Sequence, residues 1–172
     1  AVLTPRCRIL YLAAHHDQLD EGLGYLRMLL DALQESYGIR YKDGSRSTRA
    51  PKVELLDGVL YPSVFLREGK LRGRGYTLAL IDEAELMDAQ VFEYAILPAL
   101  GERRGELVLL STPRGQSYLL RYVQEAGGVV LNYPTWTNPL FPRAELEVAW
   151  RTWNRSAFAQ EFGAELVEAA GR

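Results

Sequence analysis

The sequence is poor in cysteine and in long apolar runs, and both shortages exclude classes of protein. Cys7 is the only cysteine, so no disulfide framework can form within the chain, and the composition suits a reducing compartment. No apolar run approaches the roughly 20 residues that a membrane-spanning helix needs. We therefore expect no membrane among the partners of this protein.

Lysine is scarce as well, and its positions exclude one kind of phosphate site. The chain has lysine only at Lys42, Lys52 and Lys70. The common phosphate-binding loop requires the pattern Gly-x-x-x-x-Gly-Lys-Ser/Thr, in which backbone amides and the lysine hold the phosphates. Lys70 follows a glycine, but Val64 stands in place of the first glycine and Leu71 in place of the Ser/Thr. The sequence therefore contains no such loop.

The charge balance gives no overall argument for a nucleic-acid partner, because the net charge is −2. The basic residues are uneven, however, and several gather at Arg46, Arg49, Arg67, Arg72 and Arg74. These arginines could contact DNA phosphates, contact another subunit, or form solvated loops. The sequence leaves these three interpretations open.

A chain of 172 residues is long enough for a substantial core, and we expect a single domain over residues 1–172. Near-continuous apolar runs alternate with helical patterns, which predicts an α/β fold with three layers and a mainly parallel sheet. An antiparallel hairpin is expected around Asp57-Gly58. The predicted strands cover 8–14, 78–81, 105–110 and 128–134; the predicted helices cover 18–37, 89–100, 116–125, 143–153 and 156–168.

Smaller features follow from the same pattern. Asp17 is expected to cap the first helix and Gly38 to end it, and residues 42–50 are expected to form a loop. Trp150 and Trp153 lie among helical apolar residues, where tryptophan is more often part of a core than a stacking platform for bases.

The stretch LALIDEAELMD, residues 78–88, carries the chemistry of greatest interest. Its apolar strand ends in Asp82 and Glu83, a costly arrangement unless the acids lie at the exposed carboxyl end and bind something there. In a nucleoside-triphosphate hydrolase, the Asp would hold Mg²⁺ and the Glu would orient or deprotonate the attacking water. Alternatively, the acids favour the start of the next helix, or they form a metal-dependent nuclease cluster with Glu85 and Asp88.

Other polar residues follow two further predicted strands. His15 and His16 follow the first strand, and Ser111 and Thr112 follow the strand after the acids. The carboxyl ends of parallel strands meet at one edge of a sheet, so these residues are expected near the acids. Two adjacent histidines on a strand would face opposite sides and would not readily bind one metal together.

The order of these segments resembles the ATPase domain of the large terminase subunit, the motor that packages DNA into the heads of tailed phages. The resemblance covers nearly the whole chain. It is carried by four segments: RILYLAAHHDQL; VELLDGVLYPSVFLREGKLRGRGYTLALIDEA; LVLLSTPRGQSYLLRYV; and TNPLFPRAELEVAWRTWNRSAFAQEFGAELVE.

The resemblance implies roles for individual residues in a P-loop NTPase fold of the RecA-like type. Asp82 matches the Walker B acid that coordinates Mg²⁺, and Glu83 matches the catalytic glutamate. Ser111 and Thr112 match the coupling motif that reports the nucleotide state. Arg72, in Leu-Arg-Gly, matches the position of an arginine finger that can act on a neighbouring subunit.

The resemblance also implies Mg²⁺ and ATP as cofactors of the intact protein. The implied partners are double-stranded DNA, a homo-oligomeric ring, the portal protein and the small terminase subunit, in the cytoplasm of a bacterial host. In the family, the phosphate-binding loop precedes the strand that resembles residues 8–14, so we expect it before Ala1, and we expect this chain alone to be inactive. The tail helices, residues 143–168, would close the ATPase domain. The alternative function is a non-catalytic DNA-binding or assembly module that retains the fold.

Overall fold

The computed structural model describes residues 6–47, 51–64, 74–112, 114 and 117–167. The chain divides into two compact units, residues 1–110 and residues 111–172. The prediction that the whole chain forms one domain, closed by the tail helices, stays a prediction. In the described part of the chain, no helix is long and apolar enough to cross a membrane.

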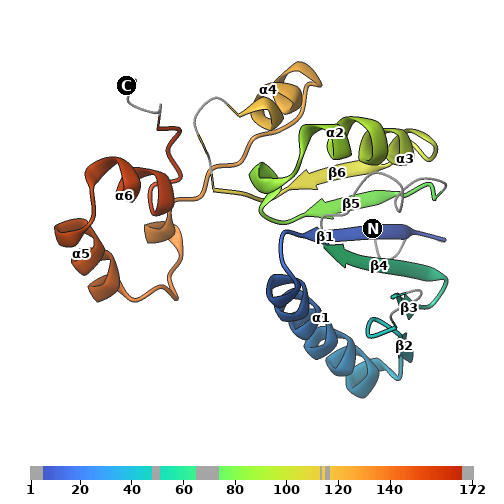
Figure 1. Cartoon of the computed structure of the whole chain (residues 1–172). Helices are drawn as coiled ribbons and strands as arrows, with labels where there is room; N and C mark the ends of the chain where they lie inside the picture. The colour runs from blue at the N-terminus through green and yellow to red at the C-terminus, as the bar shows by residue number, and fades with distance from the viewer. Residues whose placement is uncertain (1–5, 48–50, 65–73, 113, 115–116, 168–172) are drawn as a thin grey trace. The chain divides into compact units, whose positions relative to one another are not determined.

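The first unit is built on a six-stranded sheet whose order is β2-β3-β4-β1-β5-β6 (Figure 1). Strands β4, β1, β5 and β6 run parallel, and β2 and β3 form an antiparallel extension beside β4. Their bounds are Arg8–Ala13 (β1), Tyr41–Asp43 (β2), Val53–Leu55 (β3), Gly58–Val64 (β4), Leu78–Ile81 (β5) and Glu106–Leu109 (β6). The predicted mainly parallel sheet with an antiparallel hairpin is confirmed.

Helix α1 (His16–Tyr37) follows β1 and covers one face of the sheet. Its leucines recur at helical spacing, so they form one apolar face of the helix, and this face packs against the strands. Leu19, Leu23 and Leu30 are buried in a cluster that includes Ala13 of β1. Gly38 ends the helix in the left-handed conformation, and its N–H donates to the Gln34 carbonyl, as predicted for a glycine stop.

The start of α1 corrects a detail of the prediction. His15, and not Asp17, is the N-cap residue, and Asp17 lies in the first turn. The His15 N–H donates to Gln18 Oε1 at 3.2 Å, which gives one backbone donor at this helix end a partner. Asp17 places its negative charge in the first turn, where the charge interacts favourably with the positive end of the helix dipole.

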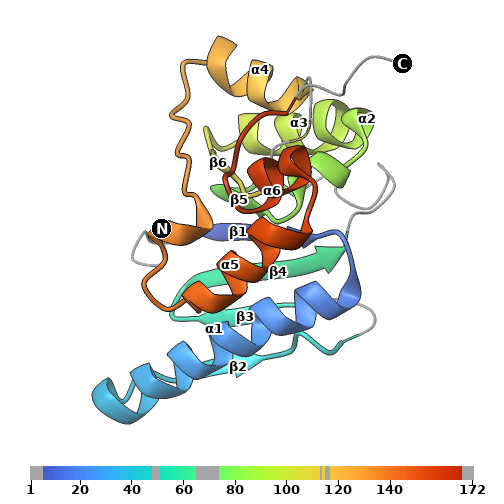
Figure 2. The same cartoon turned by 90° about the vertical axis from the view of Figure 1, so that its left-hand side faces the viewer.

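The other face of the sheet is covered by one continuous helix made of α2 (Ala89–Val91), the π-turn η3 (Phe92–Ile96) and α3 (Leu97–Gly101). Figures 1 and 2 show α2 and α3 beside β5 and β6, on the side away from α1. Phe92 and Ile96 are almost fully buried, as is Ile81 of β5. A strand buried on both faces explains the continuous apolar run in the sequence.

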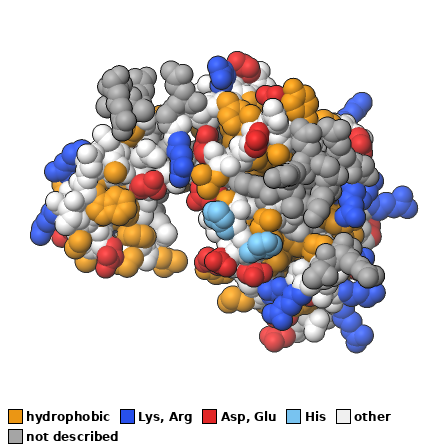
Figure 3. All heavy atoms as spheres, viewed as in Figure 1, with side chains coloured by type: hydrophobic (Ala, Val, Ile, Leu, Met, Phe, Trp, Pro, Cys, Tyr) orange, Lys and Arg blue, Asp and Glu red, His pale blue; other side chains and the backbone are white. Residues whose placement is uncertain are grey.

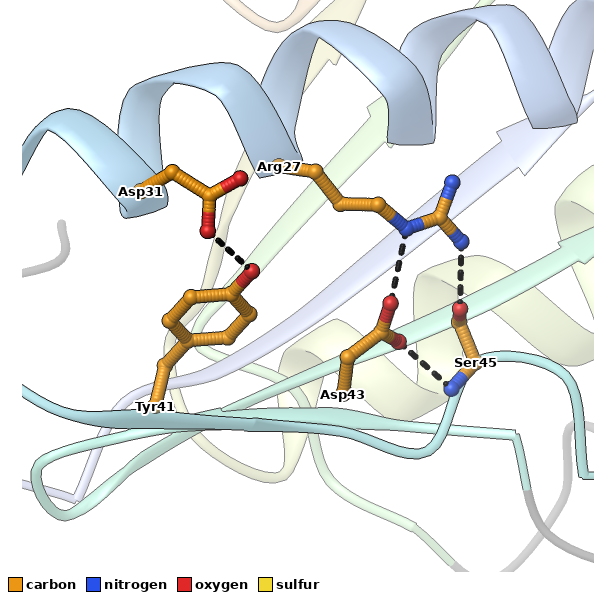
Figure 4. Close-up of polar contacts among 5 residues, drawn as sticks. All are labelled: Arg27, Asp31, Tyr41, Asp43 and Ser45. Carbon is orange, nitrogen blue, oxygen red and sulfur yellow. Dashed lines mark hydrogen bonds and ion pairs between the residues drawn. The ribbon is translucent and has the colours of Figure 1, made fainter.

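One strand was not predicted. Residues 42–50 were expected to form a loop, but Lys42 and Asp43 belong to β2, which pairs with β3. The strand has only three residues, too short for a pattern to be visible in the sequence. Side-chain contacts with α1 hold it in place (Figure 4): Arg27 Nε donates to Asp43 Oδ2 at 2.7 Å, and Tyr41 Oη donates to Asp31 Oδ1 at 2.7 Å.

The second unit holds helices α4 (Tyr118–Glu125), α5 (Arg143–Thr152) and α6 (Arg155–Glu161) and the short helical turn η4 (Thr135–Thr137). The predicted strand over residues 128–134 is wrong, because these residues are irregular. Val129 is 81% exposed and Leu131 is 69% exposed, so the apolar letters that suggested a buried strand are not buried. Isolated hydrogen bonds hold the segment instead, such as that from Asn132 Nδ2 to the Ala164 carbonyl.

An aromatic cluster organises the second unit. Trp150 packs edge-on against Phe158, and Trp153 packs edge-on against Phe162. The guanidinium of Arg155 stacks on the Trp150 ring at 3.6 Å from its centre, a favourable cation–π geometry. Both tryptophans are about half exposed, so they border the small core and are not enclosed by it.

Candidate active site

Asp82 lies at the carboxyl end of β5, between β1 and β6. Its N–H donates to the Leu12 carbonyl at 2.8 Å, and the Leu110 N–H donates to the Ile81 carbonyl at 2.9 Å. These bonds continue the sheet by one residue on each side of the strand end. They fix the backbone of Asp82, and its side chain is only partly buried. The expected position at the open end of a parallel strand is therefore confirmed.

Glu83 adopts a backbone conformation that is rare for a residue with a side chain. Its φ is 51° and its ψ is 44°, a left-handed conformation that costs roughly 1–2 kcal/mol. The Glu83 N–H donates to Asp82 Oδ1 at 3.0 Å, and the next N–H, of Ala84, donates to the Leu110 carbonyl at 3.0 Å. Ala84 is fully buried. The surrounding bonds thus hold Glu83 in a strained turn, as is frequent at functional sites.

Tyr11 of β1 is a neighbour of Asp82 that the sequence did not reveal. Tyr11 pairs with Leu80, two residues before Asp82, and residues two apart on a strand share a face. Burial raises the pKa of Tyr11 above its ordinary value, and the negative charges of Asp82 and Glu21 raise it further. The relation between Tyr11 and the strand that ends in Asp82 depends on the register of β1 against β5, so no signal in the sequence could have identified it.

Asp88 has a structural role. Its Oδ1 accepts a hydrogen bond from the Gln90 N–H at 2.8 Å, and it caps α2. Within the described residues, no three side chains of His, Cys, Asp or Glu are grouped so that they could hold a metal ion. The capping bond gives Asp88 a role other than the metal-dependent nuclease cluster of Asp82, Glu83, Glu85 and Asp88.

The histidines occupy the start of α1 and not a strand. His15 is the N-cap residue and His16 is the first helical residue. Both are exposed, and Figure 3 shows both at the surface of the first unit. They follow the carboxyl end of β1, as expected, at a helix N-terminus.

Ser111 and Thr112 continue directly from Leu110, the residue whose N–H and carbonyl both bond to the β5 end and its turn. They belong to the second unit, and their part in the site stays a prediction. Arg72 lies outside the described residues, and so do Arg49 and Arg67. Arg74 is described, and its guanidinium lies over the Tyr61 ring at 5.1 Å.

The acids fit one half of a nucleotide site. Partly exposed carboxylate oxygens at Asp82 and Glu83 are the ligand type that Mg²⁺ prefers, and Mg²⁺ needs few protein ligands when phosphates supply the others. The other half requires many hydrogen-bond donors for the phosphates, and the sequence has no loop of the required pattern. The residues present therefore fit the metal better than the triphosphate.

Solved structures identify the fold. The chain matches the large terminase ATPase domain of Thermus phage P74-26 with a TM-score of 0.71 at 20% identity, over 95% of this chain and 78% of that chain. It matches the large terminase of a thermophilic bacteriophage in complex with ATP-gamma-S with a TM-score of 0.71 at 16% identity, over 96% of this chain and 41% of that chain. That terminase has also been solved in complex with ADP.

The large terminase of bacteriophage HK97 matches with a TM-score of 0.59 at 16% identity, over 93% of this chain and 36% of that chain. The chain thus spans less than half the length of the HK97 and thermophilic-phage proteins. No protein-family model matches the sequence, and no curated protein matches it. The structural matches show that the chain has the fold of phage large terminase ATPase domains, a P-loop NTPase fold.

Proposed function

We propose that this chain is the acid-bearing part of the ATPase motor of a phage large terminase, which couples hydrolysis of ATP to movement of DNA. The observation that carries the proposal is the strained Asp82–Glu83 turn, held between β1 and β6 at the end of a buried parallel strand. The terminase ATPase fold supports it. Two structures of one neighbour are described with ADP and with ATP-gamma-S, which supports a nucleotide as ligand.

In this proposal the two acids have different tasks. Asp82 would hold Mg²⁺, and the metal would supply positive charge beside the phosphate oxygens. Glu83 orients the attacking water and accepts its proton. The turn would serve both tasks, because the hydrogen bonds from the Glu83 and Ala84 N–H groups fix the backbone that carries the two carboxylates. Preorganisation of this kind reduces the cost of reaching the transition state.

Coupling to DNA would pass through Leu110. Its carbonyl accepts the Ala84 N–H, and Ser111 and Thr112 follow it in the chain. A shift of the Asp82–Glu83 turn on hydrolysis would therefore pull on the segment that we assign to coupling. Double-stranded DNA, a ring of identical subunits, the portal protein and the small terminase subunit are the proposed partners, in the host cytoplasm. Arg72 is the proposed finger toward a neighbouring subunit.

The proposed hydrolysis requires a phosphate-binding loop, and residues 1–172 contain no Gly-x-x-x-x-Gly-Lys-Ser/Thr. We expect residues 1–172 alone to bind ATP·Mg²⁺ poorly and to hydrolyse it no faster than background, because the charge-assisted hydrogen bonds to the phosphates are missing. Titration calorimetry with ATP and Mg²⁺ measures this directly. Low-micromolar binding by the 172-residue chain would contradict the expectation.

The proposed role of Glu83 is tested in a longer polypeptide that includes the loop. We expect Glu83→Gln to keep nucleotide affinity and to lower single-turnover hydrolysis by about 10² to 10⁴, because an amide preserves shape but cannot accept the proton. The control is Glu93→Gln, the same change at an exposed position of η3, which should leave hydrolysis unchanged. Hydrolysis by Glu83→Gln at the rate of the unchanged protein would remove Glu83 from this role.

The second candidate function is a non-catalytic module, and it can also be tested. The missing loop favours a non-catalytic module that retains the fold and binds DNA or assembles with other subunits. If the coding sequence upstream of Ala1 contained no phosphate-binding loop, and the purified protein bound double-stranded DNA without nucleotide, this second function would replace the first. A gel-shift experiment without nucleotide measures this binding, and a steep loss of affinity with salt would show that it depends on phosphate contacts.

A further inference from the structure

Helix α1 is apolar on two sides. Its inner leucines pack on the strands of the first unit. A second group recurs at helical spacing on the outer side, and we call it the Met28 surface: Gly24, Tyr25, Met28, Leu29 and Ala32. Tyr25, Met28 and Leu29 are 62%, 68% and 65% exposed, and Figure 1 shows no other described element of the first unit on this side of α1. A helix that covers a sheet normally carries polar residues on its outer side, so the Met28 surface needs a separate explanation.

Gly24 is a second unusual feature of this surface. Glycine weakens the interior of a helix, because it loses more backbone freedom on folding than other residues. The other glycine within α1, Gly22, has a reason inside the chain, since a Cβ there would collide with Tyr11 Oη. A Cβ at Gly24 would meet no described atom within 4 Å. Packing within the described chain therefore explains Gly22 but not Gly24, and a glycine permits close approach of another molecule to the backbone.

Carboxylates stand at both ends of the Met28 surface. Glu21 lies seven residues before Met28 and Glu35 seven residues after it, so the three side chains occupy nearly the same side of the helix at intervals of about two turns. Both glutamates are exposed, and neither forms an ion pair within the described residues. Arg27, the one arginine or lysine of α1, is already bonded to Asp43. The surface is therefore an apolar centre between two negative charges.

These charges restrict what can bind. DNA phosphates and anionic lipid headgroups would be repelled. A second copy that packed through the same surface, about a two-fold axis at Met28, would place Glu21 against Glu35 of the partner subunit, and like charges across an interface disfavour binding. The exposed side of α5 carries Glu145 and Glu147 beside its arginines, so α5 of a second copy is no purely basic complement either. The charges favour a different protein with basic side chains.

We propose that the Met28 surface binds a helix of another protein, whose apolar stripe has Lys or Arg about two turns before and about two turns after its centre. The stripe packs on Met28 and Leu29, the basic side chains pair with Glu21 and Glu35, and the partner helix approaches closely at Gly24. Amphipathic helices bind apolar surfaces through residues at this spacing, and charges at the rim set orientation and partner choice. The proposal does not rest on ATP hydrolysis, because no residue of this surface belongs to the candidate active site.

A synthetic peptide tests the surface directly. The probe is a helical peptide of about 18 residues with a leucine stripe and an arginine about two turns on each side of its centre; a second peptide has glutamate in place of both arginines. The chain has two methionines, the exposed Met28 and the buried Met87. Labelled methionine methyl groups therefore report contact by nuclear magnetic resonance with an internal control. We expect the arginine peptide to shift the Met28 methyl signal and leave that of Met87 unchanged, and the glutamate peptide to bind about tenfold or more weakly.

Gly24→Gln separates binding from stability. Glutamine forms helices better than glycine, so the thermal midpoint should rise by about 2 °C or more. Its side chain blocks close approach, so the arginine peptide should bind about tenfold more weakly. Met28→Lys should weaken binding as much and leave the midpoint within about 2 °C, because Met28 is exposed. Val148→Lys is the matched control, since Val148 is an exposed apolar residue of α5, and it should change neither quantity.

Four outcomes would overturn the proposal. The first is no shift of the Met28 methyl signal at about 1 mM arginine peptide, a concentration at which even weak complexes form. The second is equal binding of the arginine and glutamate peptides, which would mean that Glu21 and Glu35 play no part. The third is peptide binding that neither Gly24→Gln nor Met28→Lys weakens, which would place the contact elsewhere. The fourth is a Met28 shift that grows with protein concentration without peptide, which would make a second copy the occupant.

Discussion

The two edges of the sheet differ in almost every respect. The β2 edge is three residues long, antiparallel and charged, and Arg27 and Asp31 of α1 hold it through hydrogen bonds to Asp43 and Tyr41 (Figure 4). The β6 edge is parallel and apolar, and its Val108 is partly in water. A short charged strand resists pairing with other chains, whereas an apolar parallel strand invites it.

The two edges therefore differ in the side-chain contacts that hold the edge strand. At the β2 edge, each side chain that holds the strand finds its partner within the first unit. At the β6 edge, β5 is the one strand that pairs with β6 in the described part of the chain. The candidate site lies near the β6 edge, because Asp82 and Glu83 follow β5, and β5 is the neighbour of β6.

The largest expected effect separates the centre of the sheet from its open edge. Ile81 is fully buried in β5 and Leu109 is only partly buried in β6, although the two residues pair. We expect Ile81→Ala to lower the free energy of unfolding by about 4 kcal/mol and Leu109→Ala by about 1 kcal/mol in residues 1–172. Urea denaturation measures both. Equal losses would mean that the β6 edge is already covered in this chain.

The next effect concerns the entry into β6. A Cβ added at Gly105 would lie 2.3 Å from the Tyr76 carbonyl oxygen, a backbone atom that cannot move freely, whereas a Cβ at Gly101 would meet nothing within 4 Å. We expect Gly105→Ala to cost about 3 kcal/mol of stability, since overpacking here displaces β5 from β6.

Gly101→Ala is the matched control for this change. It should leave stability unchanged or raise it by up to about 1 kcal/mol, because alanine restricts the unfolded chain more than glycine does. Thermal unfolding followed by circular dichroism measures both variants. If Gly105→Ala were as stable as Gly101→Ala, the contact between the two strands at this point would be looser than the structure has it.

The smallest expected effect is a change in the pH dependence of stability at the β2 edge. Burial raises the pKa of Asp43, but hydrogen bonds from Ser45 and Arg27 outweigh burial and lower it from 3.8 to about 2. A carboxyl with a lowered folded-state pKa stabilises the fold above pH 3.8, and this stabilisation is lost as the pH falls through about 2. Because the pair is partly exposed, we expect about 1 kcal/mol or less.

Asp43→Asn should therefore lower stability at pH 7 by about 1 kcal/mol and should flatten the loss of stability between pH 4 and pH 2. Denaturant unfolding at a series of pH values measures the slope. The exposed acid Glu35 supplies the control, since Glu35→Gln should leave the slope as it is. An unchanged slope in Asp43→Asn would show that Arg27 and Ser45 do not stabilise the charged form of Asp43.

Several elements could be predicted from the sequence because their causes are local. The leucine spacing of α1, the Gly38 stop, the Asp57-Gly58 hairpin and the apolar strand before Asp82 all depend on residues close together in the chain. Each is confirmed. The failures have the opposite cause. Strand β2 exists because β3 and α1 hold it, and residues 128–134 form no strand although they are apolar.

The sequence by itself determined the α/β pattern and the adjacency of Asp82 and Glu83 at a strand end, since periodicity and chain order are local properties. Only the tertiary structure decided that Leu12 and Leu110 lock this end on both sides, that Glu83 is held in a left-handed turn, and that β6 is the open edge. Strand order and register join residues far apart in the chain. Because no short-range pattern encodes those pairings, folding alone sets Tyr11 opposite Leu80 in the strand that ends in Asp82.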